Sequence, residues 1–290
     1  MLRRILWHVN RTPAAKAIKA VRRAGARSEV AERRALGRTL ARPPEALAVA
    51  ANLRRDGYSR ADALIDPESL AALERAVQPR TAARPAGDGG FGAHKNIWLH
   101  LLDGERVDGS LPADSPFARF ALQAPLLAAL AEYYGELPML DYVTLTYSGP
   151  VEGELKFSQL WHRDHDDTRV VKLFVYLTDV ADEDGPFTFI PGPQSDRAGF
   201  SRRSHRGDAA IAARIDVAAA VRMIAPRLSA FLVETSRCLH MGSRVAPGHE
   251  RLMYTASFIS APRIYPERAQ PFFRLAGSES AVERRVLLPG

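Results

Sequence analysis

Short runs rich in β-branched and aromatic residues dominate the chain from about residue 141 onward. Clusters of Gly, Pro or Asp separate these runs, and each run is short enough to be a single strand. The predicted strands cover residues 141–147, 170–180, 187–190, 221–224, 228–234 and 252–259. Many short strands in one half of a chain indicate a β-sandwich or jelly roll.

The N-terminal part has helical rather than strand periodicity. Apolar residues recur at helical spacing near the start of the chain, and Thr12-Pro13 would cap a second short helix. Further helices are predicted over 27–41, over 45–56 with an end near Gly57, and over 66–78 with Asp66 as the cap. Residues 79–115 are rich in Gly, Pro, Asp and Arg, which predicts loops that cover a site.

A break at Arg42-Pro43-Pro44 suggests the domain organisation. Residues 1–42 are expected to form a basic, helical N-terminal extension, and residues 43–290 one domain. The expected fold class is mainly β with flanking helices (α+β). At 290 residues, with 46% apolar and 25% charged residues, the chain has the balance of an ordinary globular protein.

Charge is distributed unevenly, and this changes what the high isoelectric point means. The net charge of +7 arises because residues 1–42 carry twelve Lys or Arg against two Glu, whereas the rest of the chain is mildly acidic. A basic arm on an acidic body is not typical of a nucleic-acid groove, so we expect no nucleic-acid partner. The single cysteine, Cys238, excludes an intramolecular disulfide and fits a reducing compartment, the cytoplasm by default.

Two histidines and one aspartate form a candidate metal site. In Trp161-His162-Arg163-Asp164, an extended backbone would place the side chains of His162 and Asp164 on the same side. We expect His240, after the apolar run 230–233 and at the end of a strand, to supply the third ligand. Two imidazoles and one carboxylate leave coordination positions open, as in non-haem iron(II) oxygenases, whereas structural zinc takes four closed ligands.

Arg251 is the candidate anchor for an acidic co-substrate. It lies eleven residues beyond His240, at the start of the run 252–259, far enough to reverse into a neighbouring strand and point back into the barrel. A guanidinium keeps its charge when buried and matches the planar geometry of a carboxylate. Tyr147 and Lys172, on the strands before and after the motif, are further candidates for binding that co-substrate, although ordinary strand roles suit both equally well.

The remaining histidines and arginines near the motif have simpler interpretations. His94, His100, His205 and His249 have no partner at ligand spacing and are expected on the surface or in hydrogen bonds. His165, Asp166 and Asp167 are expected to form an acidic loop at the pocket rim. Arg237 and Arg244 flank His240 on an exposed loop, where surface or substrate-facing roles are expected.

Together these stretches resemble the phytanoyl-CoA dioxygenase family of 2-oxoglutarate oxygenases over roughly residues 51–260. The resemblance rests on Asp56-Gly57-Tyr58, Leu64-Ile65-Asp66, the 161–164 motif, Asp184-Gly185-Pro186 leading into Ile190-Pro191-Gly192, and His240 followed by Arg251. After Pro-Gly the family usually continues with Ser-His, whereas this chain has Pro193-Gln194, a difference that concerns a loop contact and not the metal.

The resemblance implies a double-stranded β-helix, a jelly-roll or cupin-like barrel. It also implies Fe(II), 2-oxoglutarate and O2 as cofactor and co-substrates, with ascorbate as a stimulant. By this resemblance, His162, Asp164 and His240 would bind the metal, and Arg251 would bind 2-oxoglutarate. The enzyme would hydroxylate an unactivated carbon of a small-molecule or lipid-like substrate and release succinate and CO2. Family halogenases have a small residue in place of the carboxylate, so Asp164 favours hydroxylation, with desaturation, ring closure and epimerisation as alternative outcomes.

Two other functions and one further partner remain open from the sequence. A cupin-like enzyme would use the same three ligands without 2-oxoglutarate, an alternative that Arg251 disfavours, and a metal-free jelly-roll module would only bind. The apolar stripe of Leu2, Ile5, Leu6 and Val9 in a basic arm fits a helix in a membrane interface. Residues 1–42 are therefore a candidate for peripheral contact with an anionic membrane, with a transit peptide or an extension packed on the domain as the alternatives.

Overall fold

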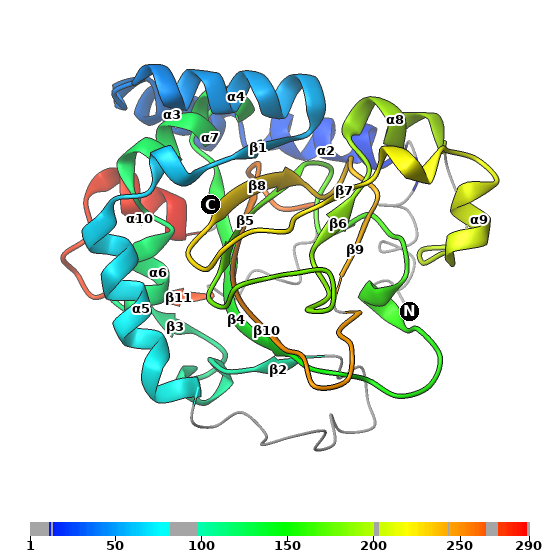
Figure 1. The fold of residues 1–290 in the computed structure, drawn as a ribbon. Helices are drawn as coiled ribbons and strands as arrows, with labels where there is room; N and C mark the ends of the chain where they lie inside the picture. Colours follow the sequence, from blue (N-terminus) through cyan, green and yellow to red (C-terminus); the bar gives the residue numbers. More distant parts are fainter. Residues whose placement is uncertain are drawn as a thin grey trace.

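A six-stranded antiparallel sheet forms the centre of the molecule (Figure 1). The computed structural model describes residue 12 and residues 14–81, 98–199, 203–242, 244–264 and 272–288. In spatial order, the strands are β1 (Tyr58–Arg60), β8 (Ala230–Glu234), β5 (Val170–Tyr176), β10 (Arg251–Ile259), β4 (Met139–Ser148) and β2 (Leu99–His100). The long strand β10 pairs with β4 on one side and with β5 on the other, so it occupies the middle of the sheet.

A smaller three-stranded sheet consists of β7 (Val221–Arg222), β6 (Thr188–Phe189) and β9 (His240–Met241). Isolated bridges extend it, joining His162 to His240 and Trp161 to Arg206. Side chains from this sheet and from β4, β5 and β10 line a common cavity, so the two sheets face each other across it. This arrangement is the expected double-stranded β-helix, and the strands of the described residues do not close into a continuous hydrogen-bonded barrel.

Helices cover the outer face of the large sheet. They are α4 (Pro44–Asp56), α5 (Pro67–Thr81), α6 (Pro116–Phe120), α7 (Ala124–Tyr134) and α10 (Ala281–Leu287). Their apolar faces pack with the outward side chains of β4, β5 and β10 in the main hydrophobic core. The short helices α8 (Gly192–Arg197) and α9 (Asp208–Ala212) lie beside the small sheet, and β3 (Leu111–Pro112) pairs in parallel with β11 (Phe273–Arg274).

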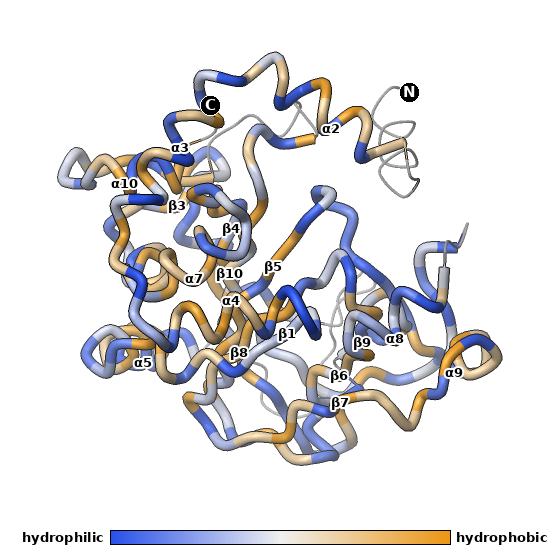
Figure 2. The backbone as a smooth tube through the Cα atoms, turned by 90° about the horizontal axis from the view of Figure 1, so that it is seen from above, coloured by the Kyte–Doolittle hydropathy of each residue, from blue (hydrophilic) through white to orange (hydrophobic). Residues whose placement is uncertain are grey.

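Two helices of the N-terminal extension pack on this domain. They are α2 (Ala14–Gly25) and α3 (Arg27–Thr39), and Figure 2 shows hydrophobic and hydrophilic stretches alternating along both. Arg33 of α3 is fully buried and donates hydrogen bonds to the carbonyl oxygens of Pro138 and Leu288. The contacts of α2 and α3 fit the alternative of a packed extension, while the division at residue 43 remains a prediction.

The membrane hypothesis is not supported by the residues that the structure describes. Lys19, Arg23 and Arg33, which contribute to the basic charge of the arm, all bind groups of the domain. The apolar stripe of residues 2–9 lies outside the described residues. Within the described ranges, every helix is too short or too polar to cross a bilayer.

Most predicted elements are confirmed, with small shifts in their ends. The helix predicted over 45–56 ends at Gly57, whose φ of 79° suits glycine and where a Cβ would lie only 2.5 Å from Cys238 Sγ. Asp66 accepts a hydrogen bond from the amide of Ser69, as expected of a cap. The predicted strand over 170–180 stops at Tyr176, and that over 228–234 begins at Ala230.

Candidate active site

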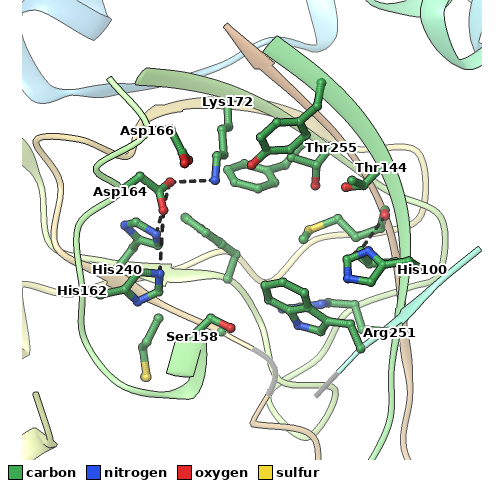
Figure 3. Close-up of a pocket in the computed structure, with 18 of the residues that line it drawn as sticks. His100, Thr144, Ser158, His162, Asp164, Asp166, Lys172, His240, Arg251 and Thr255 are labelled. Atoms are coloured by element: carbon green, nitrogen blue, oxygen red, sulfur yellow. Dashed lines mark hydrogen bonds and ion pairs between the residues drawn. The ribbon is translucent and has the colours of Figure 1, made fainter. Parts of the chain in front are cut away.

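A cavity of about 610 Å³ lies between the two sheets and contains most of the predicted site residues (Figure 3). Its walls combine charged, aromatic and small polar side chains. The lining residues are Trp98, His100, Asp103, Arg106, Tyr142, Thr144, Thr146, Ser158, His162, Asp164, Asp166, Lys172, Phe174, Phe187, His240, Met241, Gly242, Arg251, Met253, Thr255 and Phe272.

The two histidines of the predicted triad are adjacent because their backbones pair directly. The amide of His162 donates to the carbonyl of His240 at 3.0 Å, and the amide of His240 donates back at 2.9 Å. His162 Nδ1 lies 2.8 Å from the carbonyl of Leu160, and His240 Nδ1 lies 3.0 Å from that of Cys238. Because a carbonyl oxygen only accepts, each Nδ1 carries the proton, and each Nε2 has a lone pair available for a metal.

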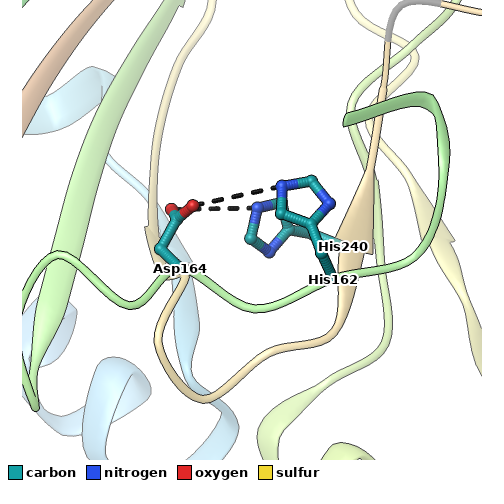
Figure 4. Close-up of side chains that lie close together, drawn as sticks. All are labelled: His162, Asp164 and His240. Atoms are coloured by element: carbon teal, nitrogen blue, oxygen red, sulfur yellow. Dashed lines mark ion pairs between the residues drawn. The ribbon is translucent and has the colours of Figure 1, made fainter. Parts of the chain in front are cut away.

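Asp164 completes the cluster from the same side (Figure 4). Its amide donates to the carbonyl of Thr235 at 2.9 Å, which fixes the backbone of the motif against the loop that precedes β9. Asp164 Oδ1 lies 4.0 Å from His162 Nε2, and Oδ2 lies 3.8 Å from His240 Nε2. One ligand atom from each residue lies within 4.8 Å of the others, a spacing that can hold a metal ion.

The strand that carries His240 to the cluster differs from the one that the sequence suggested. It was expected at the end of the strand formed by 230–233, but that strand, β8, ends at Glu234. A turn follows, and His240 begins β9 in the small sheet. The change of sheet between the two strands brings the histidine opposite the motif, because β9 then forms the bridge to His162.

Burial and neighbouring charges set the electrostatics of the cluster. Burial, followed by the proximity of His240, lowers the pKa of His162 to about 3. Burial also lowers the pKa of His240, so both imidazoles are neutral near pH 7. Burial alone would raise the pKa of Asp164, but the charge of Lys172 and the two histidines lower it well below its usual range. The cluster therefore presents two neutral nitrogen donors and one anionic oxygen donor.

Lys172, on β5, lies in the cavity but contacts the acidic member of the cluster. Its Nζ lies 2.7 Å from Asp164 Oδ2 and 5.6 Å from the centre of the Tyr142 ring. Burial would lower the pKa of Lys172, but the negative charge of Asp164 raises it well above its ordinary value. Burial raises the pKa of Tyr142 to about 12, so its phenol is protonated at neutral pH.

Arg251 lies toward the other side of the cavity (Figure 3). It is the first residue of β10, is only 2% exposed, and donates a hydrogen bond to the carbonyl of Gly185. Gly185 has a φ of 66°, and a Cβ there would lie 2.9 Å from the backbone of Arg244, so the turn that presents this carbonyl requires glycine. Arg251 was expected to reverse into a strand beside that of His240, but β10 belongs to the opposite sheet.

Tyr147 is not brought to the cavity. Side chains alternate along β4, and Tyr142, Thr144 and Thr146 line the cavity while Tyr147 belongs to the main hydrophobic core. The physical reason is parity: Tyr147 is separated by an odd number of residues from each of the three that face inward. Both faces of β4 are covered, so the hydrophobic pattern alone did not indicate which face is which.

Several cavity residues come from the region 79–115, which the sequence predicted as loops that cover a site. Trp98, His100, Asp103 and Arg106 come from the predicted loop region 79–115 and line the cavity. His205 is hydrogen-bonded to Ser204, as one of its two expected roles allowed, and its ring also stacks on that of His162 with centroids 4.9 Å apart. The composition of 79–115 thus indicated the region, but no local spacing marks the individual residues that line the cavity.

The two arginines that flank His240 are outside the cavity. Arg244 pairs with Asp208 at 2.8 Å, and Arg237 pairs with Asp196 at 2.9 Å. Their ion pairs are partly exposed, which fits the surface role rather than the substrate-facing role among the two that were expected. Arg251 is thus the arginine of the three that reaches the cavity.

Comparisons with known proteins give one family and several similar structures. The family model described as phytanoyl-CoA dioxygenase (PhyH) matches residues 53–222. No curated protein sequence matches the chain. The structure of the epimerase SnoN with Fe3+, alpha ketoglutarate and nogalamycin RO is 19% identical, with a TM-score of 0.53, and the match covers 82% of this chain and 93% of that one.

Two further solved structures have the same fold. EctD from S. alaskensis, crystallised with 2-oxoglutarate and 5-hydroxyectoine, is 17% identical with a TM-score of 0.54, and the match covers 83% of this chain and 86% of that one. AviO1 from Streptomyces viridochromogenes is 16% identical with a TM-score of 0.51, and the match covers 74% of this chain and 95% of that one. At these identities the likeness concerns the fold.

Proposed function

The chain belongs to the phytanoyl-CoA dioxygenase family, and from this premise we propose that it is an Fe(II)- and 2-oxoglutarate-dependent dioxygenase. Its reaction is the hydroxylation of an unactivated carbon in a small-molecule or lipid-like substrate. The observation that carries the proposal is the buried cluster of His162, Asp164 and His240, whose ligand atoms lie within 4.8 Å of one another in a cavity that Arg251 also lines.

The donor set of the cluster fits iron(II). Each histidine directs Nε2 toward the cluster because its Nδ1 hydrogen bonds to a backbone carbonyl, an arrangement that also fixes the orientation of the rings. Two neutral nitrogens and one carboxylate occupy one side of a metal and leave the other side open. His162, Asp164 and His240 would therefore hold the iron.

Arg251 would hold the distal carboxylate of 2-oxoglutarate. Burial lowers the pKa of this guanidinium, but arginine remains charged in proteins. A buried, permanent charge in a cavity of about 610 Å³ suits a small dicarboxylate. When bound, iron and 2-oxoglutarate supply an oxidant that removes hydrogen from carbon, with succinate and CO2 as co-products.

Other residues of the chain would prepare the site for that chemistry. Lys172 holds Asp164 Oδ2 at 2.7 Å and so limits the rotation of the carboxylate before a metal arrives. Phe174 and Phe187 cover the wall beside His240, where the rings of Phe187 and His240 stack with centroids 5.4 Å apart. These apolar rings exclude water from the metal ligands. The 2.7 Å contact favours a role of Lys172 toward Asp164 over its predicted role in binding 2-oxoglutarate.

The nature of the substrate is proposed only as a class. SnoN was crystallised with nogalamycin RO and EctD with 5-hydroxyectoine, two chemically different small molecules. The shared fold therefore does not fix the substrate or the oxidative outcome. Asp164 supports hydroxylation, because a site that keeps its carboxylate ligand has no place vacated for a halide. The mixed polar and aromatic walls of the cavity are compatible with a small organic substrate.

The test uses purified full-length protein depleted of metal. We expect it to bind one equivalent of Fe(II) under anaerobic conditions, and 2-oxoglutarate should then change the metal absorption spectrum. With oxygen and ascorbate, succinate should form slowly even without substrate. Metal binding without succinate or a spectral change would instead support a cupin-like enzyme that does not use 2-oxoglutarate. The absence of metal binding would support a binding module.

A further inference from the structure

A buried lysine connects the N-terminal helix α2 to the segment that carries two of the candidate metal ligands. Lys19 is 4% exposed, and its Nζ lies 2.8 Å from Asp167 Oδ2, 2.8 Å from the carbonyl oxygen of Ser260 and 2.6 Å from that of Pro262. These three acceptors match the three donors of an ammonium group. Lysine is almost never fully buried unless it is paired, and the three partners of Lys19 account for its burial.

Asp167, the partner of Lys19, ends the ligand-bearing segment 162–167. It is 2% exposed, and its Oδ1 accepts hydrogen bonds from the amide and the hydroxyl of Thr168 at 2.7 and 3.1 Å. Its Oδ2 accepts a further hydrogen bond from the amide of Ile264 at 3.0 Å. The carboxylate therefore fixes the chain three residues after Asp164, and it does so by joining this segment to the one that follows β10.

A second contact of α2, made by Arg23, holds the helix in the position that places Lys19 beside Asp167. Arg23, one turn further along the helix, donates to both carboxylate oxygens of Glu136, with a distance of 2.6 Å to Oε1, and to the carbonyl of Ala261 at 2.7 Å. Glu136 is 3% exposed and lies just before β4. A buried ion pair of Lys19 and a partly exposed ion pair of Arg23 thus hold α2 against the segment 260–264 and, through Lys19, against the ligand segment.

The ligand segment depends on such external contacts. Residues 163–169 contain no described helix or strand, although His162 is bridged to His240 and the amide of Asp164 donates to Thr235. These contacts fix the beginning of the segment, and the Lys19 contact fixes its end. A metal site tolerates little freedom, because its ligands must be held in a set geometry by the residues behind them.

We propose that α2 is a strap that orders the segment 162–167 for metal binding, with Lys19 as a positioning residue that acts on Asp164 through Asp167. The proposal rests on the metal site of the proposed function. Without the contact, the end of the segment 162–167 would be held less firmly, so Asp164 would be less well fixed opposite the two histidines. The affinity for the metal would then fall although all three ligands are still present. The N-terminal extension would then contribute to metal binding by ordering the ligand segment.

The test compares Lys19→Met with Arg33→Met in the full-length protein. Both variants remove a buried cation of the extension, but the hydrogen bonds of Arg33 reach Glu29, Pro138 and Leu288 rather than the ligand segment. The probe is Co(II), titrated by its absorption, together with amide hydrogen exchange of residues 162–168. We expect at least a tenfold weaker Co(II) affinity and faster exchange in Lys19→Met, and an affinity within about twofold of wild type in Arg33→Met.

Three outcomes would overturn the proposal. One is a folded Lys19→Met protein with wild-type Co(II) affinity and exchange, and another is equal weakening in the two variants, which would indicate a general loss of stability. If Lys19→Met does not fold, Asp167→Asn is tested in its place, because asparagine keeps a hydrogen-bond acceptor but loses the charge. Unchanged Co(II) affinity in Asp167→Asn is the third outcome that would overturn the proposal. Failure of wild-type protein to bind Co(II) would instead contradict the proposed metal site.

Discussion

At one side of the cavity, the candidate metal ligands lie on short segments between and beside the strands, whereas on the other side Arg251 begins a nine-residue strand. His162 and His240 are joined by one bridge, and Asp164 follows in irregular chain. Arg251 is held by the register of β10, which pairs with β4 and β5. We call these the ligand side and the arginine side.

The difference separates two ways of building a site. The ligand side depends on contacts between segments that are far apart in sequence, among them Lys19 with Asp167 and His162 with His240. The arginine side depends on the pattern of one central strand. We therefore expect the ligand side to respond to changes made at a distance, and the arginine side to respond mainly to changes of Arg251 itself.

The largest effect is expected from Asp164→Ala. This change removes the anionic member of the cluster, so metal affinity should fall by more than the roughly 10–100-fold that loss of an outer partner costs, and succinate formation should stop. The measurements are a Co(II) titration and a succinate assay. Asp166→Ala is the matched control, since Asp166 also lines the cavity but is not among the clustered ligands, and it should keep the metal. Full succinate formation in Asp164→Ala would remove this residue from the triad.

The next largest effect is expected on the arginine side. Arg251→Ala should leave the metal bound but weaken 2-oxoglutarate, because removing one partner of a buried charge pair costs about 3–5 kcal/mol, which corresponds to at least a hundredfold in affinity. The affinity for 2-oxoglutarate is measured by titrating 2-oxoglutarate into the metal-loaded protein and following the metal absorption. Arg244→Ala removes an arginine that pairs with Asp208 outside the cavity and should change nothing. An unaltered titration in Arg251→Ala would mean that another cation holds the co-substrate.

A moderate effect is expected in the pH dependence of stability of the metal-free protein. The folded-state pKa of His162 is about 3, below its ordinary value of 6.5, so the unfolded chain binds a proton in this range that the folded protein does not. The free energy of unfolding should therefore be unaffected by this group above pH 6.5 and decrease as the pH falls toward 3. For one group, the slope is at most about 1.4 kcal/mol per pH unit.

Urea unfolding at several pH values tests this sign. His162→Gln cannot take up the proton, so its stability should decrease less steeply with acid than that of wild type. His249→Gln is the control, because His249 is exposed and pairs with Asp184 away from the cluster. Equal slopes for wild type and His162→Gln would show that His162 is not buried in its neutral form.

The smallest effect is expected from Lys172→Met. The ammonium of Lys172 restrains the carboxylate of Asp164, but it also neutralises that carboxylate before a metal binds and repels a divalent cation afterwards. We expect the electrostatic effect to be the larger of the two. Its removal should therefore strengthen Co(II) binding by about three- to tenfold, on the order of 1 kcal/mol for a like charge in a partly solvated site. Lys172→Arg keeps the charge and should bind Co(II) as wild type does. Weaker binding in Lys172→Met would show that holding the carboxylate matters more than its charge.

The sequence predicted the arginine side better than the ligand side. The run 252–259 that directly follows Arg251 predicts a strand with this residue at its end, because strand formation is a local property of the run. The bridge between His162 and His240 is a property of two segments 78 residues apart, so the sequence indicated the residue types but not the sheet in which His240 lies. Residue type and spacing suggested the three ligands, and the family resemblance agreed with them, but neither indicated the bridge that joins the two histidines.

Helix α7 and Lys19 show why other features were missed. All but a few residues of Ala124–Tyr134 are buried, so this helix is apolar all round and lacks the periodicity that reveals an amphipathic helix. Lys19 lies in an arm with a net charge of +10, where a lysine is expected to face solvent. Its burial depends on Asp167, which comes 148 residues later, and no local pattern encodes such a contact.

The two faces of β4 have a consequence for how this enzyme can diversify. Tyr142, Thr144 and Thr146 face the cavity, while Val143, Leu145 and Tyr147 belong to the core beneath the helices. Because neighbouring positions serve separate purposes, selection can alter the inner row to admit a new compound without disturbing the packing that keeps the protein folded. The cavity-facing positions of β4 can therefore be substituted during evolution while its core-facing positions stay the same.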